Sequence, residues 1–429
     1  MNAPGRVRIT LILGSLSAFA PVSIDMYLPG FPVMTAQLGS SASAIQLTLT
    51  AFVISLALGQ AIAGPLSDAY GRRRPLIFGL VLYAIASVAC AFAPTAYTLV
   101  AFRALQGLGA ATGIVIARAA VRDLYSGTAL ARFFASLMLV TGLAPILAPV
   151  IGGELLRFTS WRGIFVVLSV FGALLLLSTV LGLPETLPDE RRRPARLGPV
   201  LRSYGGLIRN RFFLGYCLTS ALLFAALFAY ISGSPFVLQN IYGLTPQQFS
   251  WVFGANSVGI IVAGQLGGWL TGRFPLRGLV AGGLTVGLAG GAGLMAAVTA
   301  GAGLVLILIP LFLIVSSVGI VMPNAAALAL ADQADNAGAA SALIGITQFI
   351  VGGSLAPLAG HGALAMAVLM ASFAVGSTLA FVVLTRHQAN GQDDDHSAGD
   401  QRGDQPATRA GEHASDKTAA AGEQQLPAC

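Results

Sequence analysis

The sequence has few charged residues, few histidines and a single lysine. Charged side chains make up 10% and hydrophobic ones 55% of its 429 residues, whereas a soluble domain carries about 25% charged residues. An ordinary soluble protein is therefore excluded. The apolar residues form runs of about twenty, each long enough to cross a hydrocarbon core of ~30 Å. The sequence predicts an all-α membrane protein.

The sequence lacks the residues that nucleotide binding, metal binding and enzymatic catalysis require. The single lysine, Lys417, lies near the C-terminus, so the glycine-rich segment 107–113 has no Walker lysine and is better explained as a helix-packing face. His387, His396 and His413 are scattered rather than spaced as metal ligands. No cluster of His, Cys, Ser or acidic residues lies at one depth of the apolar runs. We expect no metal, no cofactor and no enzymatic activity.

Twelve apolar runs divide into two groups of six. The polar and basic segment 184–212 separates an N-terminal half, 1–183, from a C-terminal half, 213–385. The tail 386–429 has no apolar periodicity, so we expect it to be disordered. The predicted membrane spans are approximately 8–31, 45–66, 75–93, 97–120, 131–155, 162–183, 213–238, 248–270, 277–299, 303–325, 338–358 and 362–385.

Arginine is distributed unevenly between the two sets of loops. The formal charge is +7, and the tail contributes eight acids against four bases, so the rest of the chain carries +11. One set of loops holds only Arg157 and Arg162. The positive-inside rule then predicts that both termini lie on the cytoplasmic side of the cell inner membrane. This orientation explains the excess of arginine better than nucleic-acid binding does. The other set holds Arg6, Arg8, Arg72, Arg73, Arg74, Arg122, Arg132, the cluster 191–211, Arg273 and Arg277.

A charged segment, 64–75, separates the second and third spans. Its sequence is GPLSDAYGRRRP. Asp68 can accept hydrogen bonds at a helix end, and Gly71 permits a tight turn. A related segment, 268–273, lies between spans eight and nine and keeps the glycine and arginine but not the acid. This echo favours an internal repeat of the two halves.

Asp25 and Arg103 are candidates for proton coupling. A charge inside a membrane span costs roughly 2.5–3.5 kcal/mol on insertion scales, so such residues are usually functional. Each lies about six residues, ~9 Å, from the same end of its span, which suggests an ion pair. A small movement could then let a proton bind or leave Asp25. Asp25 could instead be hydrated and structural, and the pair could be a permanent structural ion pair.

Span five contains two prolines and a glycine pair. Pro145 and Pro149 interrupt the backbone hydrogen bonds on one face of the helix, and Gly152 and Gly153 allow close helix contact. A simple kinked helix would show the same pattern. Glu154 follows the glycines, but at a helix end it is better explained as a solvated residue.

These motifs resemble those of a known family. Segment 64–75 resembles the loop signature G-x-L-x-D-R/x-x-G-R-R/K of the major facilitator superfamily, and span five resembles the drug-exporter antiporter motif G-x-x-x-G-P-x-x-G-G, with Ala144 and Ala148 replacing two glycines. The chain is similar to the Bcr/CflA drug-resistance subfamily over residues 8–385, more strongly in the first half. The matching segments are 23–29, 46–49, 59–68, 121–125, 160–162, 184–187, 322–325 and 337–343.

The resemblance implies a function and a set of site residues. It implies a multi-pass transporter that exports drugs in exchange for protons, with cargo such as bicyclomycin, chloramphenicol-like compounds or sulfonamides. We expect the chain to act as a monomer surrounded by membrane lipid. The resemblance also implies that segment 64–75 acts as a gate, in which Asp68 holds helix ends together when the cavity faces outward. We call Gly64, Asp68, Gly71, Arg72 and Arg73 the gating loop. The implied cavity, between spans one, four, seven and ten, is lined by Met26, Tyr27, Arg103, Gln106, Phe224, Tyr230 and Asn324.

Other functions stay open at this point. Each aromatic candidate could equally pack against the protein or face lipid. A transporter of small metabolites, either an uptake symporter or an exporter, would use the same fold, but the spans offer few charged anchors for a polar cargo beyond Asp25 and Arg103. A receptor without transport activity would leave these two residues unexplained.

Overall fold

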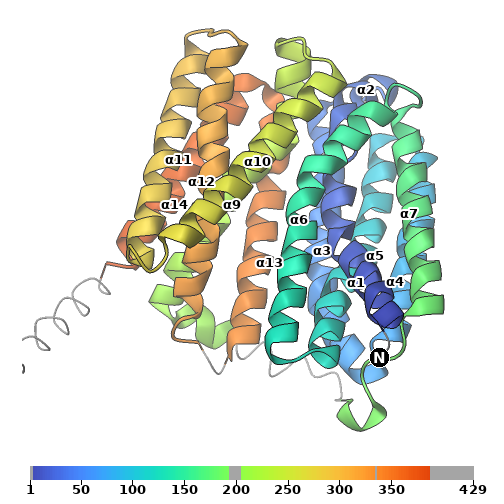
Figure 1. Cartoon of the computed structure of the whole chain (residues 1–429). Helices are drawn as coiled ribbons and strands as arrows, with labels where there is room; N and C mark the ends of the chain where they lie inside the picture. The colour runs from blue at the N-terminus through green and yellow to red at the C-terminus, as the bar shows by residue number, and fades with distance from the viewer. Residues whose placement is uncertain (1–2, 193–203, 334–335, 387–429) are drawn as a thin grey trace, which may run out of the picture. The chain divides into compact units, whose positions relative to one another are not determined.

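The computed structural model describes residues 3–192, 204–333 and 336–386. Residues 1–385 form one compact unit and 386–429 a second. Much of the predicted central loop and almost all of the tail, whose disorder we expected, lie outside the described residues. The first unit is helical, and Figure 1 shows its two groups of helices side by side, blue to green and yellow to red.

The long helices match the twelve predicted spans. Among the described residues, eleven helices are long and apolar enough to cross a membrane, and α6, which corresponds to span five, contributes the shorter apolar stretch Leu139–Leu155. The first half contains α1 (Ala3–Asp25), η1 (Leu28–Gly30), α2 (Phe31–Gln37), α3 (Ala42–Tyr70), α4 (Arg73–Ala91), α5 (Ala96–Leu124), α6 (Gly127–Leu155) and α7 (Trp161–Gly182). After η2 (Asp189–Arg191), the second half contains α9 (Arg211–Phe236), η3 (Val237–Ile241), α10 (Pro246–Leu270), α11 (Leu276–Thr299), α12 (Leu304–Leu330), α13 (Ala337–Leu355), η5 (Ala356–His361) and α14 (Ala363–Leu384).

Side chains cap several helices where the chain leaves a turn. Thr95 and Thr98 form a capping box at the start of α5, and Thr245 and Gln248 form another at the start of α10. Ser41 accepts a hydrogen bond from the backbone of Ala44 (3.2 Å). These bonds satisfy amide groups that have no partner within the helix.

The first span, predicted over 8–31, is not one continuous helix. Helix α1 ends at Asp25, and the chain continues through η1 into α2. Pro29 has no amide hydrogen, so the carbonyl group of Asp25 lacks its usual donor four residues later. Asp25 therefore lies at an interruption within the membrane crossing, not in the middle of a regular helix.

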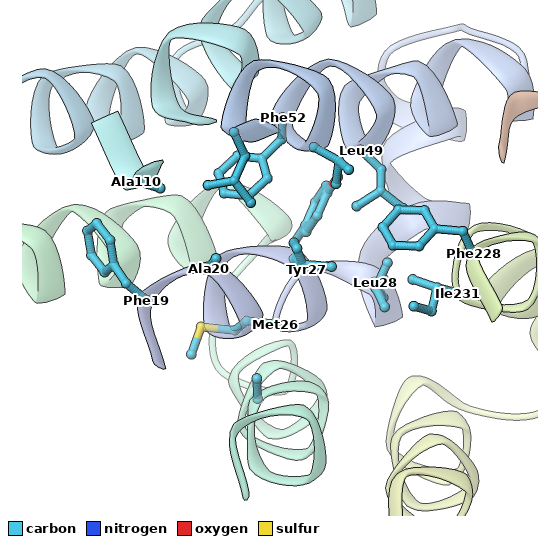
Figure 2. Packing of buried hydrophobic residues seen from close by; sticks show 14 of the residues in the cluster. Phe19, Ala20, Met26, Tyr27, Leu28, Leu49, Phe52, Ala110, Phe228 and Ile231 are labelled. Carbon is cyan, nitrogen blue, oxygen red and sulfur yellow. The ribbon is translucent and has the colours of Figure 1, made fainter. Parts of the chain in front are cut away.

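Glycines allow α5 to pack closely against its neighbours. A Cβ atom at Gly107 would collide with the carbonyl oxygen of Phe52 in α3, and one at Gly109 would lie 2.6 Å from the carbonyl oxygen of Gly79 in α4. The packing role predicted for segment 107–113 therefore agrees with the contacts. Figure 2 shows the adjoining core, where Phe52 and Leu49 of α3 face Tyr27 just beyond the end of α1.

Candidate functional site

A cavity of about 900 Å³ lies between the two halves. Its wall is mostly apolar and includes the rings of Phe224, Phe228, Tyr230, Phe253 and Phe349. We call the membrane side on which α1 begins the terminus side and the opposite side the far side. The cavity extends from Asp25 to the terminus-side ends of α5 and α13, where Arg122 and Ala337 line it.

On the far side, hydrogen bonds join the two halves. Each of them uses a side-chain donor of one half and a backbone carbonyl of the other, so the far side is closed while the cavity reaches the terminus side. They include the bonds from Gln46 to Ser232 (2.9 Å), from Thr50 to Gly353 (2.7 Å), from Gln239 to Pro29 (3.2 Å) and from Gln247 to Gly153 (2.7 Å).

Asp25 lies in the wall of this cavity and is only 4% exposed. Among the described residues, nothing forms a hydrogen bond or an ion pair with its carboxylate. An unpaired carboxylate at such a site is costly. The site therefore favours the binding of a proton or of a cationic group at Asp25.

Arg103 is fully buried on the other side of α1. Its guanidinium lies 4.4 Å from the ring centroid of Tyr27 and 4.2 Å from that of Phe52. It donates hydrogen bonds to Gln106 Oε1 (2.5 Å) and to the carbonyl oxygen of Ser23 (3.1 Å). Both aromatic faces and carbonyl dipoles stabilise a cation, so these described neighbours hold Arg103 without a carboxylate.

The ion pair expected between Asp25 and Arg103 is not present. Arg103 contacts the backbone of Ser23, and Asp25, two residues later, faces the cavity. Side chains two positions apart on a helix do not face the same neighbour. The sequence-based expectation used only depth along the membrane, which does not specify which way each side chain points.

Only some of the predicted cavity residues line the cavity. Phe224 and Tyr230 do. Tyr27 is fully buried and its hydroxyl contacts that of Thr48 (3.2 Å), and Met26 points to the opposite side of the chain (Figure 2). Outside the wall lie Met26, Tyr27, Arg103, Gln106 and Asn324. These five side chains are instead buried within the helix bundle.

The gating loop is held together by charged hydrogen bonds. Gly71 has φ of +86°, a conformation that favours glycine. Arg72 pairs with Asp68 and donates to Asp123 Oδ2 (2.9 Å). Burial lowers the pKa of Arg72, but the hydrogen bonds and charges of Asp123 and Asp68 outweigh burial, so that pKa lies above its ordinary value. The guanidinium of Arg72 therefore joins α3 to α5.

The other gating-loop residues also contact the first half. Gly64 lies within α3, where a Cβ atom would be 3.9 Å from Val115 of α5. Arg73 donates to the carbonyl oxygen of Val180 in α7 (2.6 Å). The loop thus connects helices of its own half in this conformation.

Glu185 completes the gating loop, although the sequence motifs did not single it out. Its Oε1 accepts from the backbone amide of Arg72 (2.8 Å) and its Oε2 from that of Arg73 (3.1 Å). Burial raises the pKa of Glu185, but backbone hydrogen bonds from Leu187, Arg72, Arg73 and Thr186 outweigh it and hold that pKa below its ordinary value. The available signal was the segment 184–187, which resembles the family but carries no evident role in the sequence alone.

The related loop of the second half keeps the turn, but its arginine forms no ion pair with any of the described residues. Gly272 has φ of +89°, close to the value at Gly71. Arg273 lies over the ring of Trp269, 3.7 Å from its centroid. The missing acid noted in the sequence therefore leaves an arginine–aromatic contact where the first half has carboxylates.

The proline and glycine residues of span five lie in α6, beside the second half. Pro145 lines the cavity, and Pro149 is buried. A Cβ atom at Gly152 would collide with the carbonyl oxygen of Met26, and one at Gly153 with the side chain of Ser250 in α10. The glycine pair therefore allows α6 to approach both the end of α1 and α10 on the closed far side.

Glu154 lies at the far-side end of α6. It pairs with Arg157 (3.0 Å), and both side chains are exposed. This position agrees with the solvated role expected for it.

Comparison with known proteins decides the family. The family model described as Major Facilitator Superfamily matches residues 13–357. The chain belongs to the Major Facilitator Superfamily. It is a multi-pass membrane transporter of small molecules and not an enzyme.

Two relatives match over most of their length. An MFS-type transporter of Bacillus subtilis (strain 168), YdgK, is 41% identical over 398 residues, covering 90% of this chain and 98% of that protein. A bicyclomycin resistance protein homolog of Haemophilus influenzae is 32% identical over 379 residues, covering 87% and 95%. The name of the Haemophilus influenzae relative agrees with the drug-resistance subfamily suggested by the sequence motifs.

Solved structures show the same fold. A bacterial homolog of the human lysosomal transporter Spinster, in an inward-facing and unoccupied conformation, has a TM-score of 0.70 and 16% identity, covering 90% of this chain and 96% of that one. At 16% identity, this similarity supports the shared fold only and not a shared function.

Proposed function

We propose that this chain is a proton-driven exporter of drugs that works by alternating access as a monomer in the cell inner membrane. Both termini lie in the cytoplasm, and the proton gradient supplies the energy without a cofactor. The cavity then faces the cytoplasm, where an exporter takes up its cargo. The name of the Haemophilus influenzae relative supports a cargo of the bicyclomycin type.

The unpaired carboxylate of Asp25 in an aromatic-lined cavity carries this proposal. The aromatic wall suits an apolar drug. Neutralising Asp25 by a proton removes the cost of its buried charge, and a bound drug changes that cost because it displaces water from the carboxylate. Drug binding and proton binding thereby influence each other. Asp68 keeps its proposed role of holding helix ends in the opposite, outward-facing conformation.

The test uses inside-out vesicles that contain the full chain and an acidic interior. Antibiotics from a panel are added while internal pH is recorded, and a transported drug should release protons from the vesicle. Asp25→Asn should abolish this release with insertion intact, whereas Asp189→Asn, which changes an acid paired with Arg192 on the terminus side (2.6 Å), should not. A proton symporter would move drug and protons in the same direction. Normal drug-evoked release in Asp25→Asn would remove Asp25 from the mechanism.

A further inference from the structure

Two arginines of α5 line the terminus-side end of the cavity. Arg118 and Arg122 both border the cavity and both are exposed there. Within the described ranges, the ion pairs between arginines and acids involve other arginines, as those of Asp68 and Asp123 with Arg72 do. Arg118 and Arg122 are four residues apart, so they lie on one face of the helix and repel each other. No acid in the described part of the chain pairs with either of them to offset this repulsion.

Arg118 and Arg122 lie at a different depth in the membrane from Asp25. Arg118 lies six residues, ~9 Å, and Arg122 two residues, ~3 Å, from the end of α5. Gly113 of the same helix packs against Phe19 of α1, with a Cβ atom 3.5 Å from Phe19 Cδ1. Asp25 lies on the far side of that contact and Arg118 on the terminus side. The cavity therefore has a carboxylate at its deep end and two guanidinium groups at its mouth.

Membrane orientation does not account for both residues. The positive-inside rule concerns loops and the residues next to span ends, which describes Arg122. Arg118 lies more than one turn inside α5, where a charge is costly unless it borders water or a partner. A guanidinium presents a planar fork of donors that matches carboxylate, sulfonate and phosphate groups.

We propose that Arg118 and Arg122 form an oxyanion site that receives the acidic group of an amphipathic anionic cargo. The apolar body of the cargo lies deeper, against Phe224 and Phe349. This inference rests on the proposed transport function and adds a substrate class to it. The two arginines attract the acidic group at the cavity mouth, and the carboxylate of Asp25 disfavours its passage to the deep end. Cargo is thereby oriented with its acidic group toward the terminus side.

Binding of two matched probes tests the site. The full chain is placed in phosphatidylcholine nanodiscs and titrated calorimetrically with 1-naphthalenesulfonate or with the neutral 1-naphthalenesulfonamide. We expect the sulfonate to bind more tightly. Arg118→Gln and Arg122→Gln should each weaken sulfonate binding about tenfold, as expected for loss of a charged hydrogen bond, and leave sulfonamide binding unchanged. Lysine substitutions should retain part of the preference because they keep the charge but not the fork.

Controls distinguish a cargo site from a lipid site and from misfolding. Arg157→Gln, at the exposed far-side end of α6, should leave both probes unaffected, and retained sulfonamide binding shows that a variant is folded. An unchanged sulfonate preference in both glutamine variants overturns the proposal. The titrations are repeated in discs containing phosphatidylglycerol. If this lipid removes the preference and co-purifies with the wild type but not with the variants, the site holds a lipid headgroup and the cargo assignment is wrong.

The same assay is independent of proton coupling. No proton gradient is present in nanodiscs, so the probes report on the site alone. An arginine-dependent sulfonate preference together with no drug-evoked proton release in vesicles contradicts the proposed export function and supports the oxyanion site. Drug-evoked proton release without an arginine-dependent preference for the sulfonate supports the proposed export function and contradicts the oxyanion site.

Discussion

Arg103 donates a hydrogen bond to the backbone carbonyl of Ser23 (3.1 Å), while the carboxylate of Asp25, two residues further on, faces the cavity. The last turn of α1 therefore separates a buried cation from a cavity-facing acid. Arg103 helps to hold the end of α1 in place, whereas Asp25 is available to protons and cargo. A change at one of these residues should have little effect on the energetics of the other.

A double-mutant cycle tests this independence. Arg103→Lys should lower the unfolding free energy by about 2 kcal/mol, because an ammonium group cannot stack between two rings and reach both acceptors. Asp25→Asn should cost little because no partner is lost. Unfolding of the detergent-solubilised single and double variants should give a coupling energy within about 0.5 kcal/mol of zero. A coupling energy well above this value would show that Asp25 and Arg103 interact directly, which would contradict the arrangement described here.

Glu185 should protect the backbone of the gating loop. Its carboxylate accepts from the amides of Arg72 and Arg73, so Glu185→Gln should speed hydrogen exchange at these amides at neutral pH. Glu190→Gln, an exposed acid nearby, is the matched control. Because the pKa of Glu185 is lowered in the folded protein from its ordinary 4.5, this protection should be complete above pH 4.5 and be lost as pH falls through the folded pKa. Protection that does not change in this range would contradict the assignment.

The two acids that bind Arg72 should differ in their contribution to stability. The side chain of Asp123 is 18% exposed and that of Asp68 is 52% exposed. Asp123→Asn should cost about 1–3 kcal/mol because it removes a charged hydrogen bond from a mostly buried arginine. Asp68→Asn should cost about 0–1 kcal/mol because water screens this pair. Thermal unfolding should rank the variants in that order, and equal losses would be inconsistent with the exposures.

Gly152 should be intolerant of a side chain. A Cβ atom there would collide with the carbonyl oxygen of Met26, whereas one at Gly142 in the same helix would be 3.7 Å from Ile261. Gly152→Ala should therefore cost about 1–3 kcal/mol through overpacking, and Gly142→Ala should be neutral or slightly stabilising. Thermal unfolding of both variants measures the difference. Equal stability would show that α6 is free to move away from α1.

Local sequence signals predicted the helices and several turns well. Runs of apolar residues located the twelve spans because an apolar helix satisfies its backbone hydrogen bonds internally within a hydrocarbon core. The glycine and charges of segment 64–75 predicted a turn, which the structure places at Gly71. The site was predicted less well. Asp25, Phe224 and Tyr230 line the cavity, but the expected partner of Asp25 does not bind it, and Arg118 and Glu185 were not recognised.

Length, apolarity and short motifs are local properties of the chain, and they were enough to predict the membrane class, the number of spans and the family. Three other features depended on tertiary packing: the face of α1 that carries Asp25, the rings that enclose Arg103 and the arginines that reach the cavity. Rotation of each helix about its axis is set by contacts with neighbours far away in the sequence, as at Gly152 against Met26. Burial and pairing of charged groups follow from that packing, and so they could not be predicted from spacing along the chain.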